Sequence, residues 1–155
     1  MSVRQYAFAV VAAAALFAGA GRVHAADKVC RLAISANDAM QYDKKELDVA
    51  ADCTEVTLTL THTGKLPAAA MGHDWVLVKS ADVTGVATAG MSAGLANNYL
   101  QPGDSRVIAA TRIIGGGQST SVTFPTSKLT KGGDYTYICT FPGHYVIMRG
   151  VLKFG

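Results

Sequence analysis

The chain has 155 residues, of which 50% are hydrophobic and 16% are charged. At this length it is too long to need disulfides for folding and too short for two ordinary domains, so one domain is expected. The formal net charge is +3, and the sequence contains no basic run and no basic patch interleaved with aromatic residues. A nucleic-acid partner is therefore not expected.

Residues 1–25 have the composition of a secretory signal peptide. Arg4 lies in a short polar start, residues 7–18 are apolar, and Val23-His24-Ala25 form a small-residue cleavage site. The apolar stretch has 12 residues, fewer than the roughly 20 that a membrane-spanning helix needs. We therefore expect export to the periplasm, no membrane span and one mature domain at residues 26–155. A retained N-terminal anchor is the alternative.

Short alternating segments begin the mature chain. Residues 30–34 and 47–49 alternate apolar and polar side chains, which predicts two early strands. Residues 55–62 alternate strictly, with Thr on one face and Val or Leu on the other, and they form the clearest predicted strand. A turn or loop follows at 63–67, and residues 75–78 predict a buried strand.

Residues 79–101 interrupt the strand pattern. Ala and Gly are frequent between 81 and 98, and we expect a long excursion with a short helix there, although its glycines disfavour helix. Strands are predicted again at 105–108, 121–124, 135–138 and 150–154, with glycine turns between several of them. Seven or eight short strands indicate an all-β fold, an antiparallel β-sandwich.

Export places the three cysteines in an oxidising compartment, where two are expected to pair. Cys30 and Cys53 are the natural pair. Their bridge closes a loop of about 22 residues and stabilises the fold by roughly 3 kcal/mol on a chain-entropy account. Cys139 is left over, and metal ligation explains an unpaired thiol in such a compartment and protects it from oxidation.

The loop that follows residue 138 carries three metal donors. Cys139, His144 and Met148 lie between two predicted strands, with a turn at Pro142-Gly143. Sulfur selects copper(I) and imidazole suits copper in either oxidation state, so copper is the first choice and zinc the second. A blue copper centre has two His and one Cys in a plane with a weak axial Met, and it therefore needs one further imidazole.

His73 is the predicted source of that imidazole, because it lies on a loop just before the strand at 75–78. His62 competes with it. However, His62 ends the clearest strand, where a satisfied and partly buried histidine is the simpler interpretation. A role for His62 as a proton-coupled modulator of the reduction potential is a weaker hypothesis.

Four motifs span the mature chain: Met-Gly-His-Asp-Trp-Val-Leu at 71–77, Asp-Ser-Arg-Val-Ile-Ala at 104–109, Ser-Val-Thr-Phe at 121–124 and Cys-Thr-Phe-Pro-Gly-His at 139–144. Together they resemble those of the azurins, small exported blue copper proteins of the cupredoxin fold. The resemblance implies an eight-stranded Greek-key barrel, a helical flap near 80–100 and a Cys30–Cys53 bridge at one end. It also implies a specific ligand set: His73, Cys139 and His144 in a trigonal plane, with Met148 and the carbonyl of Gly72 as axial donors.

Two positions depart from the azurin pattern. Asp74 stands where the family usually has Asn after the first ligand His, which puts the reduction potential in question. Ala110 stands where many members have a His, and this changes a surface group without touching the copper site.

Catalysis is not expected. Cys139 and His144 are tied into one loop, and no acid or amide partner is evident for a cysteine nucleophile. A copper enzyme needs an open coordination position and usually a second metal site, for which the four histidines are too few. We therefore expect a one-electron carrier. The alternative is a copper carrier or storage protein, although such proteins commonly expose Met-rich or His-rich segments and none is present.

The azurin resemblance also implies an apolar docking surface around His144. Its predicted residues are Leu66, Met71, Met91, Phe141, Pro142 and Val146. We expect a monomer that exchanges electrons with larger redox proteins, such as cytochromes or copper and haem reductases. The large aromatic residues Trp75, Phe124, Tyr135 and Tyr137 are expected in the core.

Overall fold

The computed structural model describes residues 28–155, and the predicted signal peptide lies outside them. The strands are β1 (Val29–Asn37), β2 (Gln41–Tyr42), β3 (Glu46–Val49), β4 (Glu55–His62), β5 (Val76–Lys79), β6 (Val107–Ala110), β7 (Ser119–Pro125), β8 (Tyr135–Ile138) and β9 (Arg149–Phe154). The α-helices are α1 (Ala68–Met71) and α2 (Val83–Ala93), and short 3₁₀ turns are η1 (Ser80–Asp82), η2 (Leu95–Asn97), η3 (Thr126–Lys128) and η4 (His144–Val146). Within this part of the chain, no helix combines the length and the apolar character that a membrane crossing requires.

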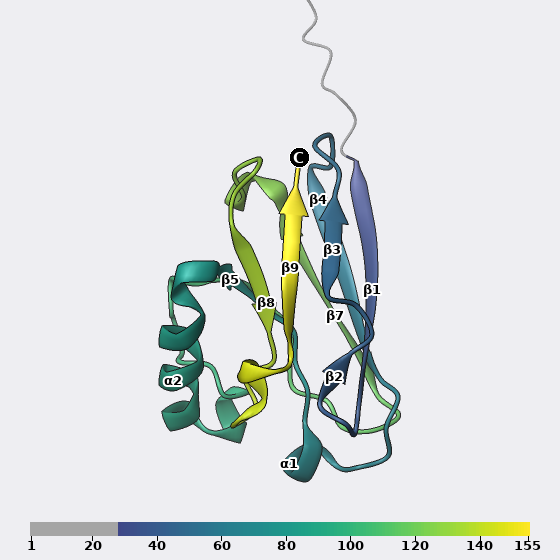
Figure 1. Cartoon of the computed structure of the whole chain (residues 1–155), viewed down its shortest axis with the longest axis vertical. Helices are drawn as coiled ribbons and strands as arrows, with labels where there is room; N and C mark the ends of the chain where they lie inside the picture. The colour runs from purple at the N-terminus through teal and green to yellow at the C-terminus, as the bar shows by residue number, and fades with distance from the viewer. Residues whose placement is uncertain (1–27) are drawn as a thin grey trace, which may run out of the picture.

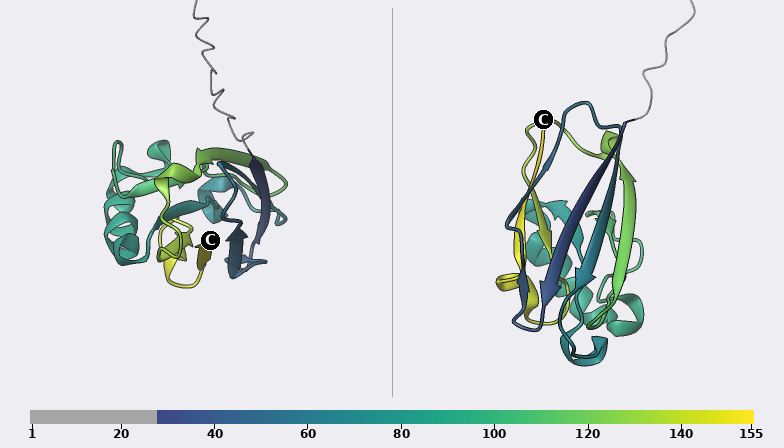
Figure 2. Two further views of the ribbon diagram at one scale, coloured as in Figure 1. Left: turned by 90° about the horizontal axis from the view of Figure 1, so that it is seen from above. Right: turned by 90° about the vertical axis from the view of Figure 1, so that its right-hand side faces the viewer.

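Two sheets face each other as the layers of a β-sandwich (Figure 2). The first has the strand order β2-β1-β4-β7 and the second β3-β9-β8-β5-β6. Both sheets are mixed, because β1 pairs with β4 in parallel and β3 pairs with β9 in parallel. The predicted β-sandwich is therefore confirmed, but the expectation that it is antiparallel is wrong for these two pairs. Between β1 and β4 the chain crosses to the other sheet to form β3, so it returns beside β1 in the same direction.

Strand β4 matches the predicted strand at 55–62 and shows how the sequence separates the two faces of a sheet. Its side chains alternate between partly exposed threonines and fully buried Val56, Leu58 and Leu60. Each outward threonine hydroxyl lies within hydrogen-bond distance of a hydroxyl on β7, as in the 3.0 Å contact between Thr57 and Thr123. The inward side chains form the core of the sandwich.

Helix α2 lies outside the second sheet, on the left of Figure 1. Its Val83 and Val86 pack in one apolar cluster with Val76, Val78 and Ile138 of β5 and β8. One of the glycines that weakened the helix prediction, Gly90, has a packing role here. A Cβ on Gly90 would lie 1.9 Å from the carbonyl oxygen of Tyr99, so glycine lets the following loop pass close to the helix.

Several boundaries differ from the sequence prediction. β6 begins at Val107 rather than at 105, because the Asp104 carboxylate accepts a hydrogen bond from the backbone N–H of Arg106 at 3.1 Å and also binds its guanidinium. Such a local side-chain bond competes with strand pairing. β5 begins after Trp75, whose N–H donates to the hydroxyl of Thr111 at 2.9 Å. Helix α1 was not predicted in the loop that follows β4.

The core lies between the sheets and surrounds the buried indole of Trp75. The rings of Phe124 and Tyr137 stack at centroid distances of 6.1 and 5.9 Å from it, and Tyr135 is also buried, as predicted for all four aromatic residues. The Cys30–Cys53 disulfide is present where β1 and β4 begin. It therefore joins the sheet at the end opposite to the loops that follow β4 and β8.

Candidate metal centre

The loop between β8 and β9 lies at the lower end of the sandwich in Figure 1. The backbone N–H of Cys139 donates to the carbonyl of Met148 at 3.0 Å, and this bond closes the loop between the end of β8 and the start of β9. Inside the loop, the N–H of His144 donates to the carbonyl of Phe141 at 2.9 Å, and Gly143 has a φ of 84°. Glycine adopts this left-handed conformation without strain, so the loop turns tightly and directs His144 back toward Cys139.

His73 comes to this loop from a distant part of the sequence. Its backbone N–H donates to the carbonyl of Ile114 at 3.0 Å, and its carbonyl accepts from the N–H of Ile114 at 2.9 Å. This two-residue bridge holds the segment before β5 beside the segment after β6. The imidazole is fully buried.

The three strongest predicted donors face one another. The Sγ atom of Cys139 lies 3.6 Å from Nδ1 of His144 and 3.8 Å from Nδ1 of His73, and all three donor atoms lie within 4.8 Å of one another. Metal bonds of about 2.0 Å to nitrogen and about 2.3 Å to sulfur, arranged trigonally, separate nitrogen from sulfur by roughly 3.7 Å. The spacing of the donors therefore fits a single metal ion.

Of the two predicted axial donors, the carbonyl of Gly72 lies near Cys139, and Met148 is buried in the core. The carbonyl oxygen of Gly72 is 3.9 Å from Sγ of Cys139. A Cβ at residue 72 would lie 2.4 Å from the carbonyl of Ala68 and 2.6 Å from Ile113, so only glycine allows this backbone to pack here. Met148 is fully buried in the same core cluster as Cys139.

A backbone carbonyl orients His73. Its Nε2 lies 2.8 Å from the carbonyl oxygen of Asn37, and a carbonyl only accepts, so Nε2 carries the proton and Nδ1 is free to face Cys139. Sequence reasoning missed Asn37 because any residue can supply this carbonyl. Only the pairing of β1 with its neighbours reveals it.

Burial sets the protonation of the donors. It lowers the pKa of His73 to about 4 and also lowers the pKa of His144, so both imidazoles are neutral and able to bind metal at neutral pH. Burial and the nearby Asp74 carboxylate raise the pKa of the Cys139 thiol well above its ordinary value. Metal binding must therefore displace the thiol proton.

Asp74 lies beside the donors as a fully buried carboxyl. It accepts a hydrogen bond from the backbone N–H of Thr140 at 2.7 Å, and its second oxygen contacts the Thr140 hydroxyl. These bonds favour the carboxylate, but burial outweighs them and raises the pKa of Asp74 to about 6. The residue that departs from the azurin pattern is thus hydrogen-bonded to the residue that follows Cys139.

His62 is not one of the three converging donors. Its Nδ1 accepts from the N–H of Gly64 at 3.0 Å, and its Nε2 lies 2.9 Å from the carbonyl of Met71. The ring is fully buried and stacks on His73 at a centroid distance of 4.4 Å. The expectation of a satisfied histidine agrees with these contacts, although the ring is more deeply buried than predicted.

Apolar side chains reach the surface at this end of the molecule. Val146 and Leu66 are 59% and 42% exposed, Pro142 is exposed, and Met71 and Phe141 are partly buried. The Phe141 ring lies 4.6 Å from the His144 ring. Sequence reasoning missed Ile147, which is 51% exposed, because the periodicity of a strand does not extend through a turn. Met91 is 46% exposed on α2.

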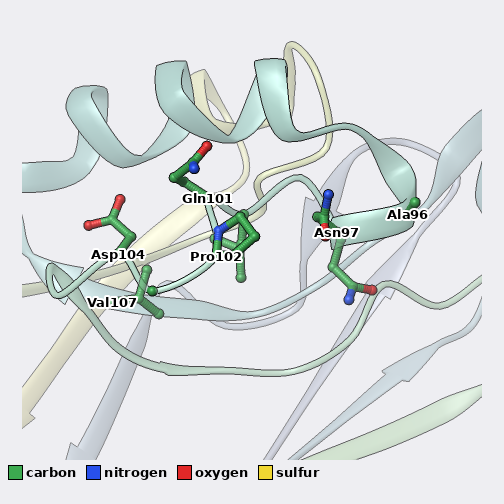
Figure 3. Close-up of a pocket in the computed structure, with 9 residues that line it drawn as sticks. Ala96, Asn97, Gln101, Pro102, Asp104 and Val107 are labelled. Carbon is green, nitrogen blue, oxygen red and sulfur yellow. The ribbon is translucent and has the colours of Figure 1, made fainter.

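A solvent-open groove of about 420 Å³ lies away from these donors, between η2 and β6. Figure 3 shows Asn97, Gln101 and Asp104 around it. Both oxygens of Asp104 bind the guanidinium of Arg106, and this ion pair holds the pKa of the carboxyl below its ordinary value. The groove therefore presents no carboxyl prepared for proton transfer.

Comparisons with known proteins agree with copper as the metal. Residues 28–155 match the family described as copper binding proteins, plastocyanin/azurin family. Azurin-1 of Alcaligenes xylosoxydans xylosoxydans is 54% identical over 124 residues, covering 80% of this chain and 96% of that relative. Azurin of Achromobacter denitrificans is 56% identical over 124 residues, covering 80% and 83%. Among solved structures, the azurin Az-iso2 from the obligate methylotroph Methylomonas sp. strain J gives a TM-score of 0.79 at 49% identity, covering 81% of this chain and 98% of that one. The chain therefore belongs to the plastocyanin/azurin family of copper-binding proteins, and within that family to the azurins.

Proposed function

We propose that His73, Cys139 and His144, together with Met148 and the carbonyl of Gly72, would hold one copper ion. The observation that carries this assignment is the convergence of two Nδ1 atoms on one buried thiol at 3.6 and 3.8 Å. Azurins are type 1 copper electron-transfer proteins, and this chain is one of them. Bound copper supplies a one-electron couple between Cu(II) and Cu(I).

The protein's contribution is to hold its donors in one arrangement for both oxidation states. The bridge between His73 and Ile114 fixes one imidazole, and the hydrogen bond from Cys139 to Met148 closes the loop that carries the other donors. Each donor is thus attached to a paired backbone segment, and none depends on a free loop. Little movement then accompanies electron transfer, and a small reorganisation favours a fast electron carrier.

The partners in this proposal are larger redox proteins that deliver and accept single electrons, such as cytochromes or copper and haem reductases. We place their contact on the apolar surface formed by Leu66, Met71, Met91, Phe141, Pro142 and Val146. The protein acts as a periplasmic monomer, exported by residues 1–25, and it has no catalytic reaction of its own. Nothing favours the alternative of copper storage.

Visible absorption spectroscopy of the copper-loaded protein tests the ligand assignment. We expect an intense charge-transfer band from the Cys139 sulfur that disappears on reduction and is absent from Cys139→Ser. His62→Gln is the matched control, because it removes an imidazole next to His73 and should keep the band. A weakly absorbing Cu(II) complex in the unmutated protein would contradict the assignment.

A further inference from the structure

The charged residues are unevenly distributed over the part of the chain that the structure describes. We call the region formed by residues 37–45, 62–75, 111–118 and 139–149 the metal end. It carries five exposed basic residues, none of them in an ion pair among the described residues. These residues, the basic rim, are Lys44, Lys45, Lys65, Arg112 and Arg149.

Few negative charges oppose the basic rim. The metal end has three carboxyl groups, and that of Asp74 is fully buried. The other two belong to Asp38, which accepts from the N–H of Lys65 at 2.8 Å, and to Asp43, which accepts from the N–H of Ser35 at 2.8 Å. Both carboxylates are thus bound to backbone donors of this chain.

The remaining described residues are balanced. They contain seven basic and seven acidic side chains, and three ion pairs of 2.6 to 2.7 Å join six of them. The pairs are Lys28–Asp52, Arg106–Asp104 and Lys153–Glu46. The positive excess of this part of the chain therefore lies at the metal end.

Members of the basic rim lie next to the loop that carries His144 and next to the Gly72 segment. Nζ of Lys45 donates to the carbonyl of Ile147 at 3.3 Å, beside the exposed Val146. Arg149 directly follows Met148 in the sequence. Arg112 precedes Ile113, whose side chain lies against Gly72. Charges at these positions act on any molecule that approaches the exposed apolar side chains.

We propose that the basic rim recruits an acidic redox protein, whose carboxylates surround an apolar contact over its own redox centre. This inference rests on the proposed electron-carrier function. Charge complementarity steers a partner into one orientation and raises the rate of association, while the apolar centre supplies a contact that releases quickly. A second copy of this chain is disfavoured at the same surface, because the two rims would repel each other.

Stopped-flow kinetics with two forms of one probe test the proposal. The probe is a basic c-type cytochrome, used unmodified and after succinylation of its lysines, which makes its surface acidic. We expect electron transfer with the acidic form to slow as the salt concentration rises from about 10 to about 200 mM, where the Debye length falls to below about 10 Å. Transfer with the basic form should accelerate over the same range.

Two double variants locate the effect. Lys45→Gln with Lys65→Gln should slow transfer with the acidic probe roughly three- to tenfold at low salt. The control, Lys128→Gln with Lys131→Gln, removes the same charge outside the metal end and should leave the rate within about twofold. The two pairs are matched, because Nζ of Lys45 and of Lys128 each donate to one carbonyl, at 3.3 and 3.2 Å. Amide chemical shifts on titration with the acidic probe should change at the metal end.

The outcomes separate this inference from the proposed function. Three results would overturn the basic rim as a docking site. The first is an equal salt dependence of the electron-transfer rate for both probes, and the second is an equal loss of rate in both double variants. The third is self-exchange that is faster at low salt than at high salt. An intact visible band and intact electron transfer in those cases would leave the carrier function standing. Loss of the band in the unmutated protein would contradict the carrier function itself.

Discussion

Asp74 is the residue whose chemistry departs most from that of the azurin pattern. Because burial raises its pKa to about 6, the carboxyl is charged at pH 8 and largely neutral at pH 5. A negative charge near the metal favours the more positive Cu(II) state and so lowers the reduction potential. We expect Asp74→Asn to raise the potential at pH 8, measured by redox titration.

The pH profile distinguishes a charge effect from a loss of structure. In the unmutated protein the potential should rise as the pH falls through the pKa of Asp74, and Asp74→Asn should flatten this part of the profile. Asn can still accept from the Thr140 N–H, and its amide can donate to the Thr140 hydroxyl, so the visible band should remain. A potential that is unchanged or lower in the variant at pH 8 would contradict the expectation.

The protonated thiol of Cys139 predicts a proton count for metal loading. At pH 7 both imidazoles are already neutral, since burial lowers their pKa values, while burial raises the pKa of the thiol. Binding Cu(II) should therefore release about one proton per metal ion. Affinity should increase with pH until the thiol is deprotonated in the metal-free protein. Calorimetry in buffers of different ionisation enthalpy measures the count, and a count near zero or near three would refute this protonation scheme.

At the scale of elements, the disulfide joins the start of β1 to the segment just before β4. In a chain-entropy account, closing a loop of this length contributes roughly 3 kcal/mol, so Cys30→Ala with Cys53→Ala should lower the free energy of unfolding by about that amount. The visible band and the potential should not change, because the metal ligands lie at the other end of these strands. Urea denaturation measures the loss, and a spectral change at unchanged fold would show coupling between the two ends.

The strands that alternate strictly could be predicted from sequence, while those shaped by tertiary contacts could not. β4 has the predicted bounds, since period-2 alternation between solvent and core indicates both its type and its length. β8 also has the predicted bounds, although it is largely buried on both faces. β6 begins two residues later than predicted, because the Asp104 carboxylate accepts hydrogen bonds from the backbone and the guanidinium of Arg106. The parallel pairs follow from chain crossovers, and no residue pattern encodes which strands become neighbours.

The candidate donors could be chosen from the sequence because their chemistry is specific. The backbone contacts that hold these donors in place could not be predicted. Two soft sulfur donors and an imidazole within ten residues indicate copper without any geometry. The carbonyl of Asn37 and the bridge at Ile114 are backbone contacts that any residue could make. The same holds for Gly72, whose need for glycine is visible only when Ala68 and Ile113 are in place.

At the scale of the whole molecule, the apolar docking surface can be tested by adding charge to it. We expect Met71→Lys and Met91→Lys to slow electron self-exchange, because two copies that meet through this surface would bring like charges together. Ala50→Lys, on the loop after β3, is the control with the same added charge. Line broadening in NMR spectra of partly reduced samples measures the rate. If neither methionine variant differs from the control at moderate salt, electrons enter through another surface.

Cys139 follows the last residue of β8 and is fully buried, while the Cys30–Cys53 bridge lies at the opposite end of the sandwich. Thiol–disulfide exchange requires a thiolate to attack a disulfide sulfur directly. Within the folded protein, neither burial nor distance allows that attack. Scrambled pairings within one molecule can therefore arise only before folding, and the ligand thiol of the folded, metal-free chain is kept apart from the chain's own disulfide.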